Sequence, residues 1–200
     1  MPHNKEIEVR FIPQDIQTVK DLLLKLGAED FGEDLLTEVA CYDKELLWVK
    51  NRKEIALVVR VRKTSKDVTL TYKRHEQNTK NSEAVEIELH VDDFEKAKAL
   101  VEAIGLTIYR TQQKRRHKFQ LGEVIIDFDT WPQCPTYLEL EGPSEELLKE
   151  TAAKLGLNWQ DAIYENAGNL VEKYFKIPVG NMHWFTFDRF ELPNDKKLLI

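Results

Sequence analysis

The feature that most constrains this chain is a recurring alternation of apolar and polar residues in short segments. Successive side chains of a β-strand point to opposite faces of a sheet, so such alternation is typical of strands with one buried face. The chain is therefore expected to be dominated by β-structure. The predicted strands lie at about residues 5–12, 35–42, 54–63, 67–75, 83–91, 106–120, 122–129 and 136–141.

Helical periodicity interrupts the strands at four places. Three of these stretches are amphipathic and each ends at a glycine, which is common after the last turn of a helix. They span about residues 13–26, 92–104 and 144–155. A fourth helix is expected around residues 160–174.

The chain contains no Gly/Ser-rich linker, so we predict one domain over residues 1–175. The composition then changes to an aromatic segment, residues 176–200, which includes Trp184 and Phe185. Aromatic side chains dominate protein cores and interfaces, so we expect this extension to pack on the domain or on a second subunit.

Composition excludes several classes of function. The 200 residues carry 29 basic and 35 acidic side chains, and the net charge of −6 argues against binding to a nucleic-acid backbone. No apolar stretch approaches the roughly 18 residues that a membrane span needs, and the first residues lack the apolar core of a signal peptide. Cys41 and Cys134 are too few for a disulfide framework. We therefore expect a cytoplasmic protein with no nucleic-acid or membrane partner.

The charged residues of the predicted strands fall on one face of each strand. Glu6, Glu8 and Arg10 alternate with apolar residues in the first strand, and later strands repeat this pattern. The basic members of these faces are Arg60, Arg62, Lys73, Arg110, Lys114 and Arg116. The acidic members are Glu86, Glu88, Asp127, Asp129, Glu139 and Glu141.

Two interpretations fit a sheet face that carries both acids and bases. The pattern alone favours an antiparallel sheet with this face in water and its apolar face under the helices. The alternative is a closed barrel with the charges inside, which requires water and a charged ligand because unpaired buried charges cost several kcal/mol each. In that case the carboxylates suit Mg²⁺ or Mn²⁺, and the guanidinium and ammonium groups suit a polyphosphate.

The order of these motifs resembles that of the CYTH domain family, also called triphosphate tunnel metalloenzymes. Glu6-x-Glu8-x-Arg10 is similar to the Glu-x-Glu-x-Lys signature of that family, and the likeness extends over about residues 5–170. Trp131-Pro132 and the segment from Tyr137 to Glu141 are most similar to the class IV adenylyl cyclase branch. The other matching motifs are Val59-Arg60-Val61-Arg62, Leu70-Thr71-Tyr72-Lys73, Lys114-Arg115-Arg116 and the stretch from Asp129 to Glu141. The resemblance implies an α+β fold, a closed eight-stranded antiparallel tunnel with helices packed on its outside.

The resemblance also implies roles for individual residues. The implied ligands of a Mg²⁺ or Mn²⁺ cofactor are Glu6, Glu8, Asp129, Glu139 and Glu141. The implied triphosphate-binding residues are Arg10, Arg60, Arg62, Lys73, Arg110, Lys114 and Arg116. The implied catalytic residues are Glu6, Glu8, Arg10 and Glu139. Arg10 stands where the family has lysine. Arginine keeps the positive charge at this position but lacks an amine that could donate a proton.

The expected function is that of a metal-dependent enzyme acting on a small-molecule triphosphate such as tripolyphosphate or ATP. Hydrolysis is favoured, because it needs only the triphosphate site, whereas cyclisation also needs a base pocket and an aligned ribose. A class IV adenylyl cyclase that forms cyclic AMP and pyrophosphate is the first alternative. A non-catalytic module that binds a nucleotide or polyphosphate is the second, and a homodimer is possible in each case.

Overall fold

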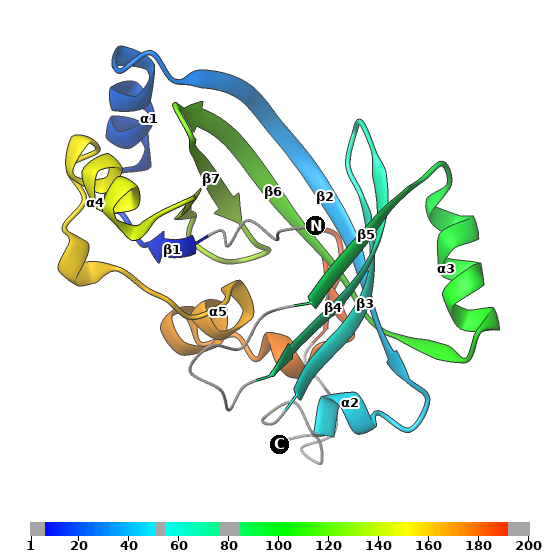
Figure 1. Cartoon of the computed structure of the whole chain (residues 1–200). Coiled ribbons are helices and arrows are strands. Elements are labelled where there is room, and N and C mark those ends of the chain that lie inside the picture. Colours follow the sequence, from blue (N-terminus) through cyan, green and yellow to red (C-terminus); the bar gives the residue numbers. More distant parts are fainter. Residues whose placement is uncertain (1–6, 51–54, 77–84, 192–200) are drawn as a thin grey trace. The chain divides into compact units, whose positions relative to one another are not determined.

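The computed structural model describes residues 7–50, 55–76 and 85–191 (Figure 1). The chain forms two compact units. The first consists of Met1–Asp34 and Lys114–Gly180, and the second of Leu35–Gln113 and Asn181–Ile200. Two long strands, β2 and β6, each contribute residues to both units because the divisions fall within them.

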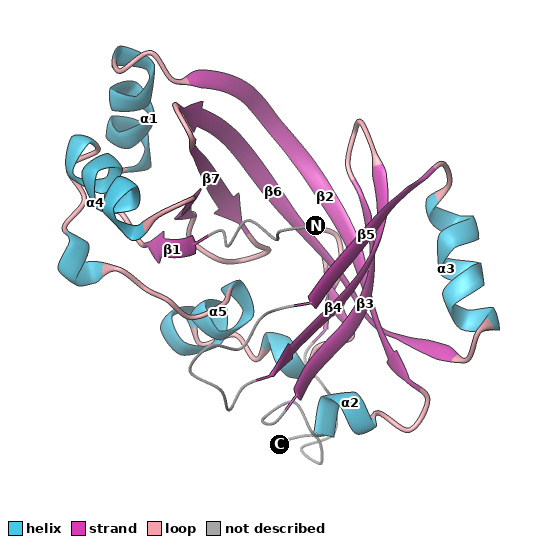
Figure 2. Cartoon of the chain, viewed as in Figure 1, coloured by secondary structure: helices cyan, strands magenta, loops and turns pink. Residues whose placement is uncertain are grey.

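The chain combines antiparallel strands with helices, as an α+β protein does (Figure 2). The strands are β1 (Ile7–Phe11), β2 (Glu29–Asp43), β3 (Ile55–Lys63), β4 (Val68–Glu76), β5 (Val85–Val91), β6 (Leu106–Leu121), β7 (Val124–Thr130), β8 (Tyr137–Gly142), β9 (Trp184–Phe185) and β10 (Phe190–Glu191). The helices are α1 (Ile16–Lys25), α2 (Leu47–Lys50), α3 (Phe94–Ala103), α4 (Glu145–Lys154) and α5 (Ala167–Phe175), with short 3-10 helices η1 (Trp159–Asp161) and η2 (Val179–Asn181).

The eight predicted strands are confirmed, and they form one ladder in the order β1-β8-β7-β6-β2-β3-β4-β5. Closure of this ladder into a tunnel would need β1 to pair with β5, and that pairing is not found among the described residues. The α+β class and the antiparallel arrangement are therefore confirmed, whereas the closing pair of strands is not part of the described ladder.

Several predicted boundaries were wrong. Strand β2 begins at Glu29 instead of residue 35, although its first residues lack the alternating pattern. Helix α1 begins at Ile16 with Asp15 as its N-cap, so Pro13 precedes the helix. Helix α5 begins at Ala167, because the Asn166 side chain caps it there by accepting a hydrogen bond from the Asn169 amide. The short helix α2 was not predicted.

In the first unit, one face of the sheet packs against helices. Val9, Leu140, Ile126 and Phe119 follow one another across β1, β8, β7 and β6, and all are almost fully buried. Helix α1 contributes Val19 and Leu23 to the same core, and α4 contributes Leu148, Ala152 and the adjoining Leu155. The opposite face of these strands is therefore the one that carries the charged residues.

The second unit repeats this division between an apolar and a charged face. Val39 and Val61 pair across β2 and β3 and pack with Ala97 and Val101 of α3. No helix among the described residues is both long and apolar enough to cross a membrane.

The C-terminal segment adds strand pairing to the second unit. Strand β9 runs parallel to β6, with Trp184 opposite Thr111 and Phe185 opposite Gln112. Phe185 is fully buried. Strand β10 then turns back and pairs with β9.

Candidate functional site

The charged face of the first unit is ordered by strand register. Glu8 of β1 lies opposite Glu141 of β8, and Arg10 lies opposite Glu139. Glu139 in turn lies opposite Asp127 of β7. Because directly opposite side chains in an antiparallel pair lie about 5 Å apart at Cβ, this register brings acids and bases into contact.

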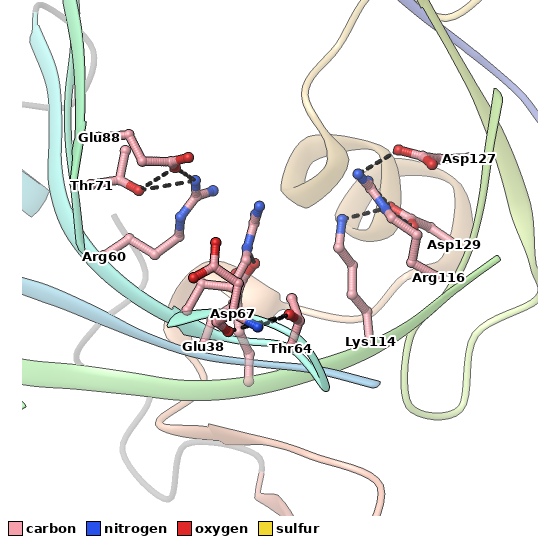
Figure 3. Close-up of polar contacts among 12 residues, drawn as sticks. Glu38, Arg60, Thr64, Asp67, Thr71, Glu88, Lys114, Arg116, Asp127 and Asp129 are labelled. Atoms are coloured by element: carbon pink, nitrogen blue, oxygen red, sulfur yellow. Dashed lines mark hydrogen bonds and ion pairs between the residues drawn. The ribbon is translucent and has the colours of Figure 1, made fainter. Parts of the chain in front are cut away.

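Asp129 is fully buried and lies at the centre of a cluster with Lys114 and Arg116 (Figure 3). Lys114 Nζ lies 2.6 Å from its Oδ2, and Arg116 donates from Nε and Nη2 to its two oxygens at 2.7 Å. The Tyr137 hydroxyl also donates to Oδ2, at 3.2 Å, and accepts from the indole N–H of Trp131 at 3.0 Å. Burial opposes ionisation, but Lys114 and Arg116 hold the pKa of Asp129 well below its usual value.

Asp127, two residues earlier on the same strand, has the opposite character. Its Oδ2 pairs with Arg116 Nη1 at 2.5 Å, but its buried Oδ1 has no hydrogen-bond partner among the described residues. Burial raises the pKa of Asp127, and Arg116 and Lys118 offset this only in part. Arg116 also reaches Glu139, at 3.2 Å, so one guanidinium contacts three carboxylates.

Arg10 is fixed from several directions. Its backbone exchanges hydrogen bonds of 2.8 Å with Ile163, and its Nη1 donates to the carbonyl of Glu165 at 2.7 Å. Its Nη2 pairs with Glu8 and, at 2.7 Å, with Glu139. Burial raises the pKa of Glu139, but Arg10, Lys114 and Arg116 together lower it below its usual value.

The charged face of the second unit holds a chain of polar contacts across β3, β2 and β6. Arg62 Nε lies 2.5 Å from Oε1 of Glu38, which is 4% exposed. The other oxygen of Glu38 accepts from Gln112 Nε2 at 2.7 Å. Gln112 Oε1 accepts from Arg110 Nε, also at 2.7 Å.

Arg60 of the second unit lies beside Thr71 and Glu88 and makes long polar contacts with them (Figure 3). Its Nη2 lies 3.4 Å from the Thr71 hydroxyl, 3.8 Å from Glu88 and 3.9 Å from Glu86. Its buried Nε has no hydrogen-bond partner among the residues that the structure describes. Burial and the neighbouring Arg62 lower the pKa of Arg60.

The structure places the predicted site residues in two groups. Those in the first unit are Glu8, Arg10, Lys114, Arg116, Asp129, Glu139 and Glu141. Those in the second unit are Arg60, Arg62, Lys73 and Arg110. Within the second unit Lys73 pairs with Glu86 at 3.0 Å. Glu6 lies outside the described residues. The roles assigned to all of these residues stay predictions.

Sequence reasoning missed two members of the polar network, Glu38 and Gln112. Gln112 lies between Arg110 and Lys114 at a spacing of two, so strand alternation alone could have placed it on their face. Glu38 could be found only from the register of β2 against β3, which sets it opposite Arg62.

The carboxylates of the first unit do not offer a ready metal site. Carboxylate oxygens are suitable donors for Mg²⁺ or Mn²⁺. However, no group of three His, Cys, Asp or Glu side chains is arranged to hold a metal ion within the described part of the chain. Two of the predicted ligands, Glu8 and Glu139, are bridged by Arg10, and Asp129 is fully buried between Lys114 and Arg116.

Several solved structures share this fold. A protein of Pyrococcus horikoshii is 25% identical, with a TM-score of 0.63, over 80% of this chain and 96% of its own. A "putative adenylate cyclase" of Vibrio parahaemolyticus is 13% identical, with a TM-score of 0.66, over 84% of this chain and 97% of its own. A "putative adenylyl cyclase" of Hippeastrum, described as having a dominant triphosphatase activity, is 16% identical with a TM-score of 0.54, over 87% and 97%.

The two cyclase-named structures are less than 25% identical to this chain, so they support the fold alone. No curated protein matches the chain. The family model of the CYTH domain matches residues 4–175, which include all the predicted site residues. The chain therefore belongs to the CYTH domain family.

Proposed function

We propose that this chain is a divalent-metal-dependent enzyme that hydrolyses a triphosphate, either tripolyphosphate or a nucleoside or other organic triphosphate. The CYTH family binds triphosphate substrates, which supports the class of substrate. Hydrolysis is chosen over cyclisation because it needs only a triphosphate site, whereas cyclisation also needs a base pocket and an aligned ribose.

The observation that carries this proposal is the state of Arg60. Its ion pairs with Glu86 and Glu88 are long, its Nε is buried without a partner in the described chain, and its pKa is lowered by burial and Arg62. A desolvated guanidinium with weak partners gains strongly from an anion, and phosphate oxygens match its planar donors. Arg60 therefore has the properties of a preformed phosphate-binding group.

Lys114 and Arg116 of the first unit also suit phosphoryl transfer, as cations that are already held in place. Lys114 and Arg116 are held in place by Asp129, so they need no reorganisation when negative charge develops nearby. In hydrolysis, water would add to the terminal phosphorus, the bond to its bridging oxygen would break, and orthophosphate would leave. Fixed cations stabilise the charge that spreads over the phosphoryl oxygens in such transfers.

The metal dependence of the proposal follows from the family likeness. Mg²⁺ or Mn²⁺ would be the ion, for which Glu6, Glu8, Asp129, Glu139 and Glu141 are the proposed donors.

Adenylyl cyclase activity is the second candidate, favoured by the Trp131-Pro132 motif and by the cyclase names of two structural neighbours. In that reaction the ribose 3′-hydroxyl would attack the α-phosphorus of ATP, and pyrophosphate would leave. The same cations could serve both reactions, so only the identity of the products distinguishes a hydrolase from a cyclase.

The test is product analysis with tripolyphosphate and ATP, each with Mg²⁺ or Mn²⁺. Orthophosphate from either substrate supports the hydrolase, whereas cyclic AMP with pyrophosphate supports the cyclase and overturns the hydrolase. Binding of either compound without turnover would indicate a non-catalytic binding module and overturn both enzyme proposals.

The Arg60→Ala variant should lower kcat/KM by about 10- to 100-fold, which is the usual effect of losing a hydrogen bond to a charged group. The matched control is Arg189→Ala, since Arg189 pairs with Glu191 and stacks on Trp184 away from these groups.

A further inference from the structure

Arg10 occupies the position between two carboxylates that are predicted to bind the metal. Its Nη2 contacts Glu8 and Glu139, and its side chain is 5% exposed. The Glu165 carbonyl accepts from Nη1, which holds the guanidinium from the other side. The cation is therefore built into the site by β1, β8 and the segment that precedes α5.

A guanidinium in this position satisfies the attraction of these carboxylates for positive charge. It carries a delocalised positive charge and five N–H donors. A divalent ion that approached the same oxygens would have to displace Arg10 or remain close to a like charge. Arg10 and Glu139 are buried and Glu8 is half-exposed, so repulsion between the guanidinium and the ion is only partly screened by water and disfavours the ion.

We propose that Arg10 acts as a built-in cation that keeps divalent metal away from Glu8 and Glu139 in the substrate-free protein. This inference rests on the proposed function for the identity of the metal and of the anion. Phosphate oxygens are strong bidentate acceptors for a guanidinium, so a bound triphosphate would compete with the two carboxylates for Arg10.

The experiment measures Mn²⁺ binding to the substrate-free protein from the electron paramagnetic resonance signal of free Mn²⁺. Wild type is expected to bind Mn²⁺ weakly. Arg10→Gln, which removes the charge, should tighten binding on the order of tenfold or more, whereas Arg10→Lys, which retains it, should stay weak. Arg189→Gln is the control for loss of one positive charge elsewhere.

A second comparison keeps the test decisive if Arg10→Gln does not fold. Glu139→Gln should leave Mn²⁺ binding to the otherwise native protein unchanged within about twofold, because Arg10 already blocks that carboxylate. If Arg10→Gln does fold, adding Glu139→Gln to it should remove the gain in Mn²⁺ binding. Tight binding of Mn²⁺ to wild type that depends on Glu139 would overturn the inference.

The readout also separates this inference from the proposed function. Mn²⁺ binding requires no turnover, so a protein that releases no phosphate yet shows the Arg10 effect loses only the proposed activity. A protein that hydrolyses tripolyphosphate but binds Mn²⁺ tightly through Glu139 when substrate-free keeps its activity and loses the inference about Arg10.

Discussion

At the scale of single residues, the clearest contrast is between two aspartates on one strand. Asp129 forms ion pairs with both Lys114 and Arg116, which favour its ionised form. Asp127 pairs only through one oxygen, with Arg116, and its other oxygen is buried without a hydrogen-bond partner in the described chain. The pKa of Asp129 is lowered and that of Asp127 is raised. Ionised Asp129 thus stabilises the fold, while the charge on Asp127 costs part of what its ion pair contributes.

This contrast predicts unequal effects of two identical substitutions. Asp129→Asn should lower the free energy of unfolding by about 3–5 kcal/mol, because it leaves buried Lys114 without its carboxylate. Asp127→Asn should cost less than about 2 kcal/mol, since Arg116 keeps Asp129 and Glu139. Urea unfolding of the two variants at neutral pH measures the difference, and equal losses would contradict this account.

The cysteines give a second prediction at this scale. Burial raises the pKa of Cys41 to about 11 and that of Cys134 to about 12. The thiolate is the reactive form, so both should resist alkylation by iodoacetamide at pH 7.5 in the folded protein. Mass spectrometry should show rapid double alkylation only in denaturant. Fast labelling of either thiol under native conditions would be inconsistent with these pKa values.

At the scale of elements, β6 connects the C-terminal segment to the charged face of the second unit. Gln112 of β6 lies opposite Phe185 of β9 in the strand pairing. Its side chain forms hydrogen bonds with both Glu38 and Arg110. The C-terminal pairing therefore supports the strand from which this polar chain extends. That residues 176–200 form a separate extension remains a prediction.

Gln112 should act as a positioning residue for Arg62 and Arg110. Gln112→Leu removes both of its hydrogen bonds, so the KM for tripolyphosphate should rise about 3- to 10-fold with a smaller change in kcat. Gln113→Leu is the matched control, because Gln113 lies on the other face and contacts Thr37 and the backbone of Phe187. A drop in kcat alone, or equal effects in both variants, would argue against positioning.

Burial in the β9–β10 hairpin predicts a second pair of unequal effects. Phe185→Ala should destabilise the protein by about 3–5 kcal/mol, because Phe185 is fully buried beside Phe190. Phe187→Ala, at a side chain that is 37% exposed, should cost less than about 1 kcal/mol. Thermal unfolding of both variants checks the assignment, and a stable Phe185→Ala protein would show that the hairpin adds little.

At the scale of the whole molecule, much of the fold was predictable because alternation assigns each strand residue to a face. The faces of Arg60, Arg62, Asp129 and Glu139 were all predicted in this way. The start of β2 was not, since the segment from Glu29 contains charged residues on both faces and Gly32 at positive φ.

The contacts of the candidate site were less predictable than its faces. Opposition of Glu38 and Arg62 depends on strand register, which alternation does not determine. The bond from Arg10 to the carbonyl of Glu165 joins residues 155 positions apart and involves a backbone group that every residue has. Such a contact leaves no signal in the sequence.

The charge of the whole chain gives a further prediction. Although its net charge is −6, the protein should bind a polyanion where its cations are concentrated. Tripolyphosphate at about 100 times its Kd, with Mg²⁺, should stabilise the fold by about 2.7 kcal/mol and raise Tm by about 5–10 °C. Orthophosphate at the same concentration should have a much smaller effect, and differential scanning fluorimetry would reveal equal shifts if this were wrong.

The backbone pairing of Arg10 with Ile163 bears on how the protein behaves at high concentration. Strand β1 lies at one end of the ladder, and outer strands with open amide and carbonyl groups are sites where chains associate and aggregate. At Arg10 both of these groups are already used by the chain itself. Residues that follow η1 thus shield the strand from foreign strands at the point where Arg10 is anchored.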